Sequence, residues 1–448
     1  MLTPNLQIDK RIAGKINLTV SHFKASIEVF MRLFKVFLIF LILIFISCDT
    51  NKTAELWTDR PEFALYANYF NTMQDQYKIN VRFIASPGAE LTVNSGKKNT
   101  PDIIAASRLK TSSMGSMFRS LDNLFGKNKL SKDIFYPILL SIGRIDKNQY
   151  LLPVSFNIPL LVFSKDRGSD LRGFELSNQF TIDFEEIKKL SQSYNVRSRG
   201  AFTRMGFSPL WNNNFLFTAA VICGASFREA NPLAWDAAAL ERSMVLINEW
   251  ANEINTNTQS DDDFTYKYFF EPPEKLLESG RILFSYMESG DLFTLNEESK
   301  NNLDFRWIME QDKIPVSEDS VYIGIPKKAK SLQSARAFIM WFLRIENQRN
   351  LLEYSRNYRI NESSFGICGG FSALTPVTEQ IYPLFYPELL GRMPPSENFI
   401  LQNILPGNWE SIKERVVLPY LSDRARSENA EDIYALERRL SDWMRLNR

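Results

Sequence analysis

The sequence predicts an α/β protein in which neighbouring strands run parallel. The first observation is a succession of strand, helix and strand: residues 53–57 are expected to form a strand, apolar side chains at 63–77 follow helical spacing, and residues 79–84 alternate. The second is that this order is typical of βαβ units, whose strands pair in parallel. The third is length, since about 400 residues follow Cys48, enough for two domains of ordinary size.

The first predicted helix begins just after the first strand. Asp59 is expected to cap it, Glu62 stands three residues later as in a capping box, and Pro61 suits the first turn. Residues 100–107 are expected to form another strand, opened by a proline.

Two extended segments follow near the middle of the chain, at 150–157 and 158–164. Pro159 cannot donate a ladder hydrogen bond, so the second segment is expected at an edge or at a crossing between domains, and not as a central strand. The later expectations are helices at 236–254 and 273–279, strands at 281–286 and 321–325, one long helix at 331–354, and a charged amphipathic helix at 429–446.

An apolar run, residues 36–46, ends just before Cys48 and follows the basic segment 31–35. The run is shorter than the ~20 apolar residues of a membrane span, so it is expected to be a secretory signal. It resembles a bacterial lipoprotein signal, although Phe45 replaces the usual leucine, and this implies cleavage before Cys48 and a lipid on its thiol. The alternative is an uncleaved N-terminal membrane segment. Residues 1–30 are expected to be a misassigned upstream extension, 31–47 the signal peptide and 48–53 the tether.

Composition excludes several classes of function. The net charge of +1 offers no electrostatic attraction to nucleic acid. The single histidine, His22, precedes the expected mature chain, so imidazole-dependent nucleophiles and common zinc sites are not expected. No phosphate-binding or dinucleotide-binding glycine motif is present. Cys223 and Cys368 are more simply buried free thiols than a disulfide, although pairing stays open.

Short segments in a fixed order resemble the extracellular solute-binding proteins of ABC importers, in particular the sugar-type lipoproteins. These segments are 56–63, 87–91, 100–104, 149–155, 223–227, 279–285, 326–331 and 335–342, with Gln348. The resemblance implies two α/β lobes joined by strands that cross near 155–163, 314–325 and 360–370. It also implies that 54–157 with 321–362 form one lobe, that 158–320 with 363–448 form the other, and that a ligand binds between them.

Ligands of open parallel sheets lie beyond the carboxyl ends of strands, next to helix N-termini. That rule nominates Trp57, Thr58, Asp59, Glu62, Ser107, Arg108, Ser155, Asn157, Tyr286, Met287 and Glu288. Rings suited to stacking on a sugar are Trp57, Trp211, Tyr286 and Phe371, with Asn212 as a polar neighbour.

Each nomination has a plainer alternative. Trp57 equally suits a strand core, Asp59 and Glu62 suit a helix cap, and residues 211–214 suit a loop before a helix. The acidic run 261–263 is expected to be a solvated loop.

The function expected is that of a lipid-anchored binding protein that delivers a solute, most simply a sugar or oligosaccharide, to an ABC permease. The expected protein is monomeric and non-enzymatic, holds no cofactor or metal, and faces outward from the cytoplasmic membrane, where Asp49 favours retention by resemblance to enterobacterial sorting. Three alternatives stay open: a surface glycoside hydrolase using two carboxylates, a binding protein for a cationic solute such as a polyamine, and a sensor or adhesin.

Overall fold

Six strands form the first sheet, in the order β17-β6-β16-β3-β1-β2. The computed structural model describes residues 52–93, 100–166, 180–231 and 233–447. The predicted parallel pairing is confirmed, because β1 pairs in parallel with both β2 and β3. β16 and β17 are antiparallel to their neighbours, so the sheet is mixed. The strands are β1 (Thr53–Thr58), β2 (Lys78–Phe83), β3 (Ile103–Ser107), β6 (Leu151–Phe156), β16 (Val321–Gly324) and β17 (Phe371–Ser372).

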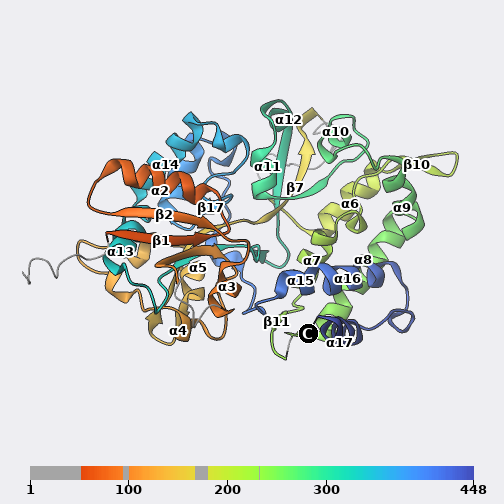
Figure 1. The fold of residues 1–448 in the computed structure, drawn as a ribbon. Coiled ribbons are helices and arrows are strands. Elements are labelled where there is room, and N and C mark those ends of the chain that lie inside the picture. Colours follow the sequence, from red (N-terminus) through yellow and green to blue (C-terminus); the bar gives the residue numbers. More distant parts are fainter. Residues whose placement is uncertain (1–51, 94–99, 167–179, 232, 448) are drawn as a thin grey trace, which may run out of the picture. The chain divides into compact units, whose positions relative to one another are not determined.

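Both faces of this sheet are covered, which explains why its central strands are apolar throughout. Alternate residues of β3 take opposite sides: Ile103 joins one apolar cluster, and Ile104 joins another. Figure 1 shows helices on either side of the strands. They are α2 (Glu62–Met73), α3 (Pro87–Val93), α4 (Met114–Met117), α5 (Pro137–Ile142), α13 (Leu332–Phe342) and α14 (Ile345–Asn357).

The long helix expected over 331–354 is two helices, α13 and α14. Arg344 between them has extended backbone angles, φ −86° and ψ 135°. The Asn347 side chain donates to the Trp341 carbonyl (2.6 Å), which replaces a hydrogen bond that a continuous helix would make. The bend lets both helices bury their apolar stripes in the same core, which a helical period alone does not reveal.

Four strands form the second sheet, in the order β13-β7-β14-β8. Pro159 is the first residue of β7, where a missing N–H is tolerated. The expectation of an edge strand is wrong, because β7 lies between β13 and β14; the alternative, a crossing, is confirmed, because β7 follows β6 of the first sheet directly. The strands are β7 (Pro159–Ser164), β8 (Thr181–Ile182), β13 (Ser285–Glu288) and β14 (Leu303–Ile308).

Helices around the second sheet enclose a separate apolar core, which contains Trp250 and Trp409. The helices of this core are α6 (Phe184–Tyr194), α7 (Asn213–Ile222), α8 (Ala237–Ile254), α15 (Trp409–Ile412), α16 (Leu418–Arg426) and α17 (Leu436–Leu446). Four further helices follow in this part of the chain, α9 (Thr258–Lys267), α10 (Pro273–Glu278), α11 (Ser289–Thr294) and α12 (Glu297–Asn302), and the buried apolar side chains of α9, α10 and α11 belong to the cluster of the first sheet. Short two-stranded pairs are β4 (Arg144–Ile145) with β5 (Asn148–Gln149), β9 (Val196–Ser198) with β10 (Ala201–Arg204), and β11 (Arg228–Glu229) with β12 (Leu233–Ala234).

Three local expectations for this part of the chain are corrected. The acidic run 261–263 lies inside α9, and Asp261 is fully buried with a pKa held well above its ordinary value by burial. The strand expected at 281–286 begins at Ser285, because Leu283 and Phe284 instead donate to the Gly206 carbonyl. The last helix begins at Leu436, after a short 3-10 turn at 430–432.

The chain passes between the sheets three times. The first crossing is at Asn157, between β6 and β7, and the second runs from β14 through β15 (Ile314–Pro315) to β16. The third, expected near 360–370, occurs after residue 398, where β18 (Phe399–Ile400) pairs with β15. Residues 371–389 therefore lie with the first sheet and not with the second lobe, because β17 pairs with β6 and Tyr382 fills the first core.

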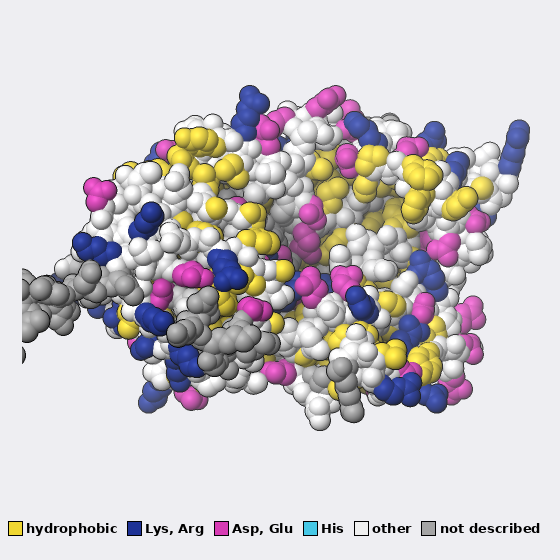
Figure 2. Space-filling model, viewed as in Figure 1, with side chains coloured by type: hydrophobic (Ala, Val, Ile, Leu, Met, Phe, Trp, Pro, Cys, Tyr) yellow, Lys and Arg dark blue, Asp and Glu magenta, His cyan; other side chains and the backbone are white. Residues whose placement is uncertain are grey.

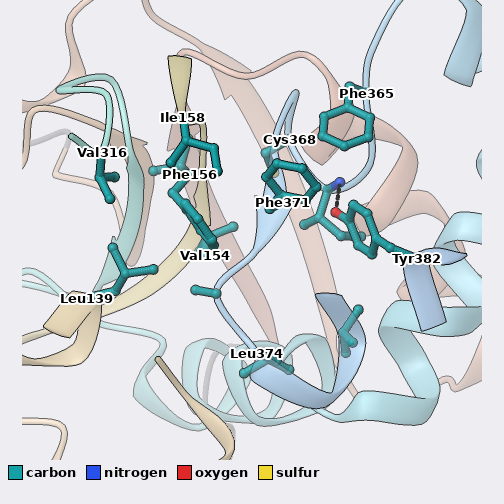
Figure 3. Packing of buried hydrophobic residues seen from close by; sticks show 14 of the residues in the cluster. Leu139, Val154, Phe156, Ile158, Val316, Phe365, Cys368, Phe371, Leu374 and Tyr382 are labelled. Atoms are coloured by element: carbon teal, nitrogen blue, oxygen red, sulfur yellow. Dashed lines mark hydrogen bonds between the residues drawn. The ribbon is translucent and has the colours of Figure 1, made fainter. Parts of the chain in front are cut away.

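One apolar cluster continues from the first sheet to the second. Phe156, Phe371, Phe365 and Tyr382 pack together on one side of the crossing (Figure 3). Phe293 of α11 stacks on Phe365 with ring centroids 4.6 Å apart. The two lobes are therefore in apolar contact beside the first crossing. A hinge motion at this crossing must either preserve or break these contacts.

Cys223 and Cys368 are free thiols, as expected, and Cys368 is the buried one. Cys48 and the rest of the predicted signal lie outside the described residues. Within the part of the chain that the structure describes, no helix combines the length and the apolar content of a membrane span.

Candidate functional site

A cavity of about 450 Å³ lies between the two sheets, and all three crossings contribute to its wall. Asn157 comes from the first crossing, residues 315–319 from the second and Gln402 from the third. Its volume is in the range usual for small-molecule sites. Figure 2 shows acidic side chains in the hollow near the middle of the face in view.

The wall from the first lobe is built at the ends of β1 and β3. The expected helix cap by Asp59 is wrong: Pro61 occupies the cap position of α2, and no side chain bonds there. Asp59 instead accepts hydrogen bonds from the backbone N–H (3.1 Å) and hydroxyl (2.6 Å) of Ser107. This tie joins the two strand ends and fixes the loop from which Arg60 lines the cavity.

Arg60 connects the first lobe to the second crossing. Its Nη2 donates to the Asp319 carbonyl at 3.1 Å and lies 3.4 Å from the Asp319 carboxylate. Glu62 accepts a hydrogen bond from Ser364 through one carboxylate oxygen. These polar contacts at the cavity hold the segment from Arg60 to Glu62 against the loops that contain Asp319 and Ser364.

Asn157 holds the crossings together at the cavity wall. Its Nδ2 donates to the Gly369 carbonyl (3.0 Å), and its Oδ1 accepts from the Ser289 hydroxyl (2.6 Å). Its own carbonyl accepts from the Ser317 N–H at 2.9 Å. One side chain therefore links the first crossing to α11 and to the loop before β17, while its backbone bonds the second crossing.

Glu288 lies at the end of β13, where the second lobe reaches the cavity. It accepts hydrogen bonds from the hydroxyls of Tyr286 (2.8 Å) and Ser317. Burial, together with the nearby Asp319, raises the pKa of Glu288 from its ordinary 4.5 to about 7, against the opposing effect of these two hydrogen bonds. Tyr286 in turn shares a 2.9 Å hydrogen bond with Thr218 of α7.

Ion pairs at the cavity link elements that are distant in sequence. Arg108, after β3, pairs with Glu410 of α15, and Glu318 pairs with Lys413. The Lys413 ammonium also lies 4.5 Å from the centre of the Phe217 ring. The Arg108–Glu410 pair joins the first lobe to a helix of the second.

Several polar atoms at this cavity are buried and lack a hydrogen-bond partner among the described residues. They include Glu62 Oε2, Asp319 Oδ1 and Arg108 Nε. Unpaired buried polar atoms are costly, so they mark places where a polar ligand is stabilised by hydrogen bonds. The wall thus offers both donors and acceptors.

Five nominated residues line this cavity together: Glu62, Arg108, Asn157, Tyr286 and Glu288. Asp59 and Ser107 lie just behind the wall, bonded to each other. Trp211 and Asn212 line a second cavity on the second lobe. The remaining five are buried away from both cavities: Trp57, Thr58, Ser155, Met287 and Phe371. Their burial gives them packing roles, as the alternative for Trp57 anticipates.

The nominations miss Arg60, Asp291, Asp319, Ser364 and Lys413, all of which line the cavity. A signal existed for Asp319, because it lies within 314–325, a segment expected to cross between the lobes. Lys413 had none, since the third crossing that brings α15 to the cavity was expected elsewhere. Within the described residues, no group of three or more His, Cys, Asp or Glu side chains is placed to hold a metal ion.

Two mixed lobes, three crossings and a polar cavity between them define the fold of ABC substrate-binding proteins. Solved structures of that class match nearly the whole described chain. CpMnBP1 with mannotriose bound has a TM-score of 0.56 and 13% identity, and the match covers 87% of this chain and 98% of that one. A Listeria monocytogenes ABC substrate-binding protein in complex with cycloalternan has a TM-score of 0.56 and 14% identity over 87% and 96% of the two chains.

The GacH receptor of Streptomyces glaucescens, solved unliganded and with acarbose, has a TM-score of 0.53 and 13% identity over 88% of this chain and 98% of that one. No family model and no curated protein matches the sequence. The likeness at this identity establishes the fold, while the ligand has to be argued from the cavity.

Proposed function

We propose that this chain is the substrate-binding protein of an ABC importer and that it captures an oligosaccharide between its lobes. The observation that carries the proposal is the polar cavity at the three crossings, in a fold whose solved neighbours were crystallised with mannotriose, cycloalternan and acarbose. Amide and hydroxyl groups from Asn157, Asn214 and Ser364 suit sugar hydroxyls, and rings of Phe217 and Phe365 supply apolar contact.

Delivery to a membrane permease and anchoring through a lipid on Cys48 belong to the same proposal. A soluble receptor that serves a permease gains from staying near the membrane, and several acyl chains are needed for stable anchoring. We propose the outer side of the cytoplasmic membrane as its location. We propose that the protein acts by binding and not by catalysis, because the solved neighbours are described as a substrate-binding protein and a receptor.

A cationic solute is the second candidate, and the charge of the cavity favours it. Six carboxylates line the cavity against three cationic side chains. The carboxylates are Glu62, Glu288, Asp291, Glu318, Asp319 and Glu414, and the cations are Arg60, Arg108 and Lys413. Two of the three cations are paired with cavity carboxylates, which leaves acidic groups in excess.

A thermal-shift screen of the full chain tests both candidates. The detergent must lack a sugar headgroup, and the probes are mannotriose, cycloalternan, acarbose and spermidine. A ligand of the folded state raises Tm with concentration, by an amount equivalent to ~2.7 kcal/mol at one hundred times its Kd. A shift with spermidine alone favours the cationic candidate, and no shift with any probe contradicts both.

Two neighbouring asparagines of α7 supply the variant and its control. Asn214 is exposed and lines the cavity, while Asn213 is also exposed and does not line it. Asn214→Ala is expected to weaken oligosaccharide binding by roughly fivefold, because it removes a hydrogen bond to the ligand, and Asn213→Ala to leave it unchanged. Equal effects of the two substitutions would place the ligand elsewhere.

A further inference from the structure

A second cavity of about 280 Å³ lies on the second lobe, next to the first cavity. Tyr286 lines both cavities. On the other side, Asn214 lines the first cavity and Asn212, two residues earlier, lines the second. The two spaces are therefore neighbours around the same tyrosine and the same start of α7.

The second cavity differs from the first in its chemistry, because aromatic rings dominate its wall. Trp211 and Phe264 are stacked, with centroids 5.6 Å apart and an angle of 16° between the ring planes. Tyr268 packs against Phe264 at 4.9 Å. Phe269 completes this wall although 70% of it is exposed. These rings come from α9 and the turn after it, and from the short 3-10 helix Pro209–Trp211 that precedes α7.

Polar groups accompany the rings. Asn212, Thr265 and Glu271 line the same cavity. The Trp211 indole N–H is buried and has no hydrogen-bond partner among the described residues. A buried indole donor usually finds a partner, so this one marks a place for an acceptor. Flat apolar faces beside a few donors and acceptors are the chemistry that recognises a sugar ring, whose C–H face is apolar and whose edge carries hydroxyls.

We propose that the second cavity is a further saccharide subsite, which binds one end of an oligosaccharide whose other units lie in the first cavity. This inference rests on the proposed function. Tyr286 and the start of α7 border both cavities, so the second cavity adjoins the first, and its aromatic and polar wall suits a further unit of the same saccharide. The exposed ring of Phe269 then covers the outermost sugar unit. The ligand class is consequently a linear oligosaccharide longer than the first cavity alone accommodates.

Chain length and one exposed ring provide the test. Calorimetric titrations of the full chain, in a detergent without a sugar headgroup, compare manno- and malto-oligosaccharides of increasing length. Affinity is expected to rise when the chain becomes long enough to occupy the second cavity. Phe269→Ala is expected to weaken the long probes by roughly two- to tenfold, because it removes the apolar surface that covers the outermost sugar, and to leave the short probes unchanged.

Phe270→Ala is the matched control, since Phe270 is the next residue, is 95% exposed and does not line the cavity. Because both rings are exposed, neither substitution is expected to unfold the protein. If Phe269→Ala and Phe270→Ala bind every probe equally, or if affinity is independent of chain length, the second subsite is refuted while the proposed function stands. If the parent protein binds no saccharide, the proposed function fails and the subsite fails with it.

Discussion

At the residue scale, Glu288 shows how a local environment sets a property that sequence does not show. The residue ends a strand, where its carboxylate meets two hydroxyl donors and the nearby Asp319. Burial raises its pKa to about 7, which keeps it protonated in the folded state at pH values where an unfolded chain has lost the proton.

This raised pKa makes folding stability depend on pH in a definite direction. Below about pH 4.5 Glu288 is protonated in both the folded and the unfolded state, so it does not change the free energy of unfolding. Between pH 4.5 and 7 the unfolded state releases this proton while the folded state keeps it. The free energy of unfolding therefore falls as pH rises. Glu288→Gln cannot ionise, so its free energy of unfolding should fall less over this range, by at most about 3 kcal/mol. Urea unfolding of both proteins from pH 4.5 to 7.5 measures the difference. Parallel curves would show that Glu288 does not titrate in this way.

At the element scale, the C-terminal end of α5 approaches the backbone of β6 closely, which fixes the position of α5 against the first sheet. Gly143 ends α5, and its carbonyl accepts hydrogen bonds from the N–H groups of Tyr150 (2.8 Å) and Leu151 (3.1 Å). A Cβ on Gly143 would lie 1.9 Å from the Leu151 carbonyl oxygen. Only a residue without a side chain fits there, because the obstacle is backbone in a central strand.

Gly143→Ala is therefore expected to destabilise the protein by ~3 kcal/mol or more, since β6 or α5 must move. Gly407→Ala is the control, because nothing lies within 4 Å of the position of its Cβ. Thermal unfolding of the two variants measures the contrast. A Gly143→Ala protein as stable as the parent would mean that α5 shifts at no cost.

At the scale of the whole molecule, the lobes are joined by the aromatic cluster on one side and by ion pairs around the cavity. Phe293 and Phe365 stack across the lobes, while Arg108 and Glu410 pair near the cavity. Salt screens exposed ion pairs, whereas it does not screen apolar contact. The dependence of ligand affinity on salt concentration therefore distinguishes the ion pairs from the aromatic cluster.

Glu410→Gln breaks the Arg108 pair, which also lowers the pKa of Glu410. Glu410 is 61% exposed, so the pair is worth about 1 kcal/mol or less. Ligand affinity of the variant is expected to fall by a few-fold at low salt and to match the parent at ~1 M salt. Glu428→Gln is the control, because it removes an exposed carboxylate after α16 that does not line the cavity and has no ion pair among the described residues. A decrease in affinity that persists at high salt would contradict an electrostatic role.

Much of the fold was predictable because local patterns carry it. Apolar alternation and helical spacing placed β1, α2, β2, β3 and α8 close to their observed bounds. The break between α13 and α14 was not predictable, because both helices keep the same apolar face and only packing against the core requires the bend. The helix that contains Asp261 was missed because a run of three acids looks solvated until a neighbouring core buries one of them.

The candidate site was predictable only where a strand end and a cavity coincide. Residues at strand ends that line the cavity include Glu62, Arg108, Asn157 and Tyr286. Trp57 also lies at a strand end, but its side chain belongs to an apolar core. Side-chain direction alternates along a strand, so one residue of register separates a ligand contact from a packing contact.

By itself the sequence determined the α/β class and the parallel pairing of the first strands, because these depend on short-range periodicity, whereas the first two crossings were expected from the resemblance to solute-binding proteins. The tertiary structure alone decided the third crossing, the return of β17 to the first sheet and the pairing of Arg108 with Glu410. These features join segments that lie 85 to 302 residues apart in the sequence. They are fixed by which apolar surfaces pack together, and a linear pattern does not contain that information.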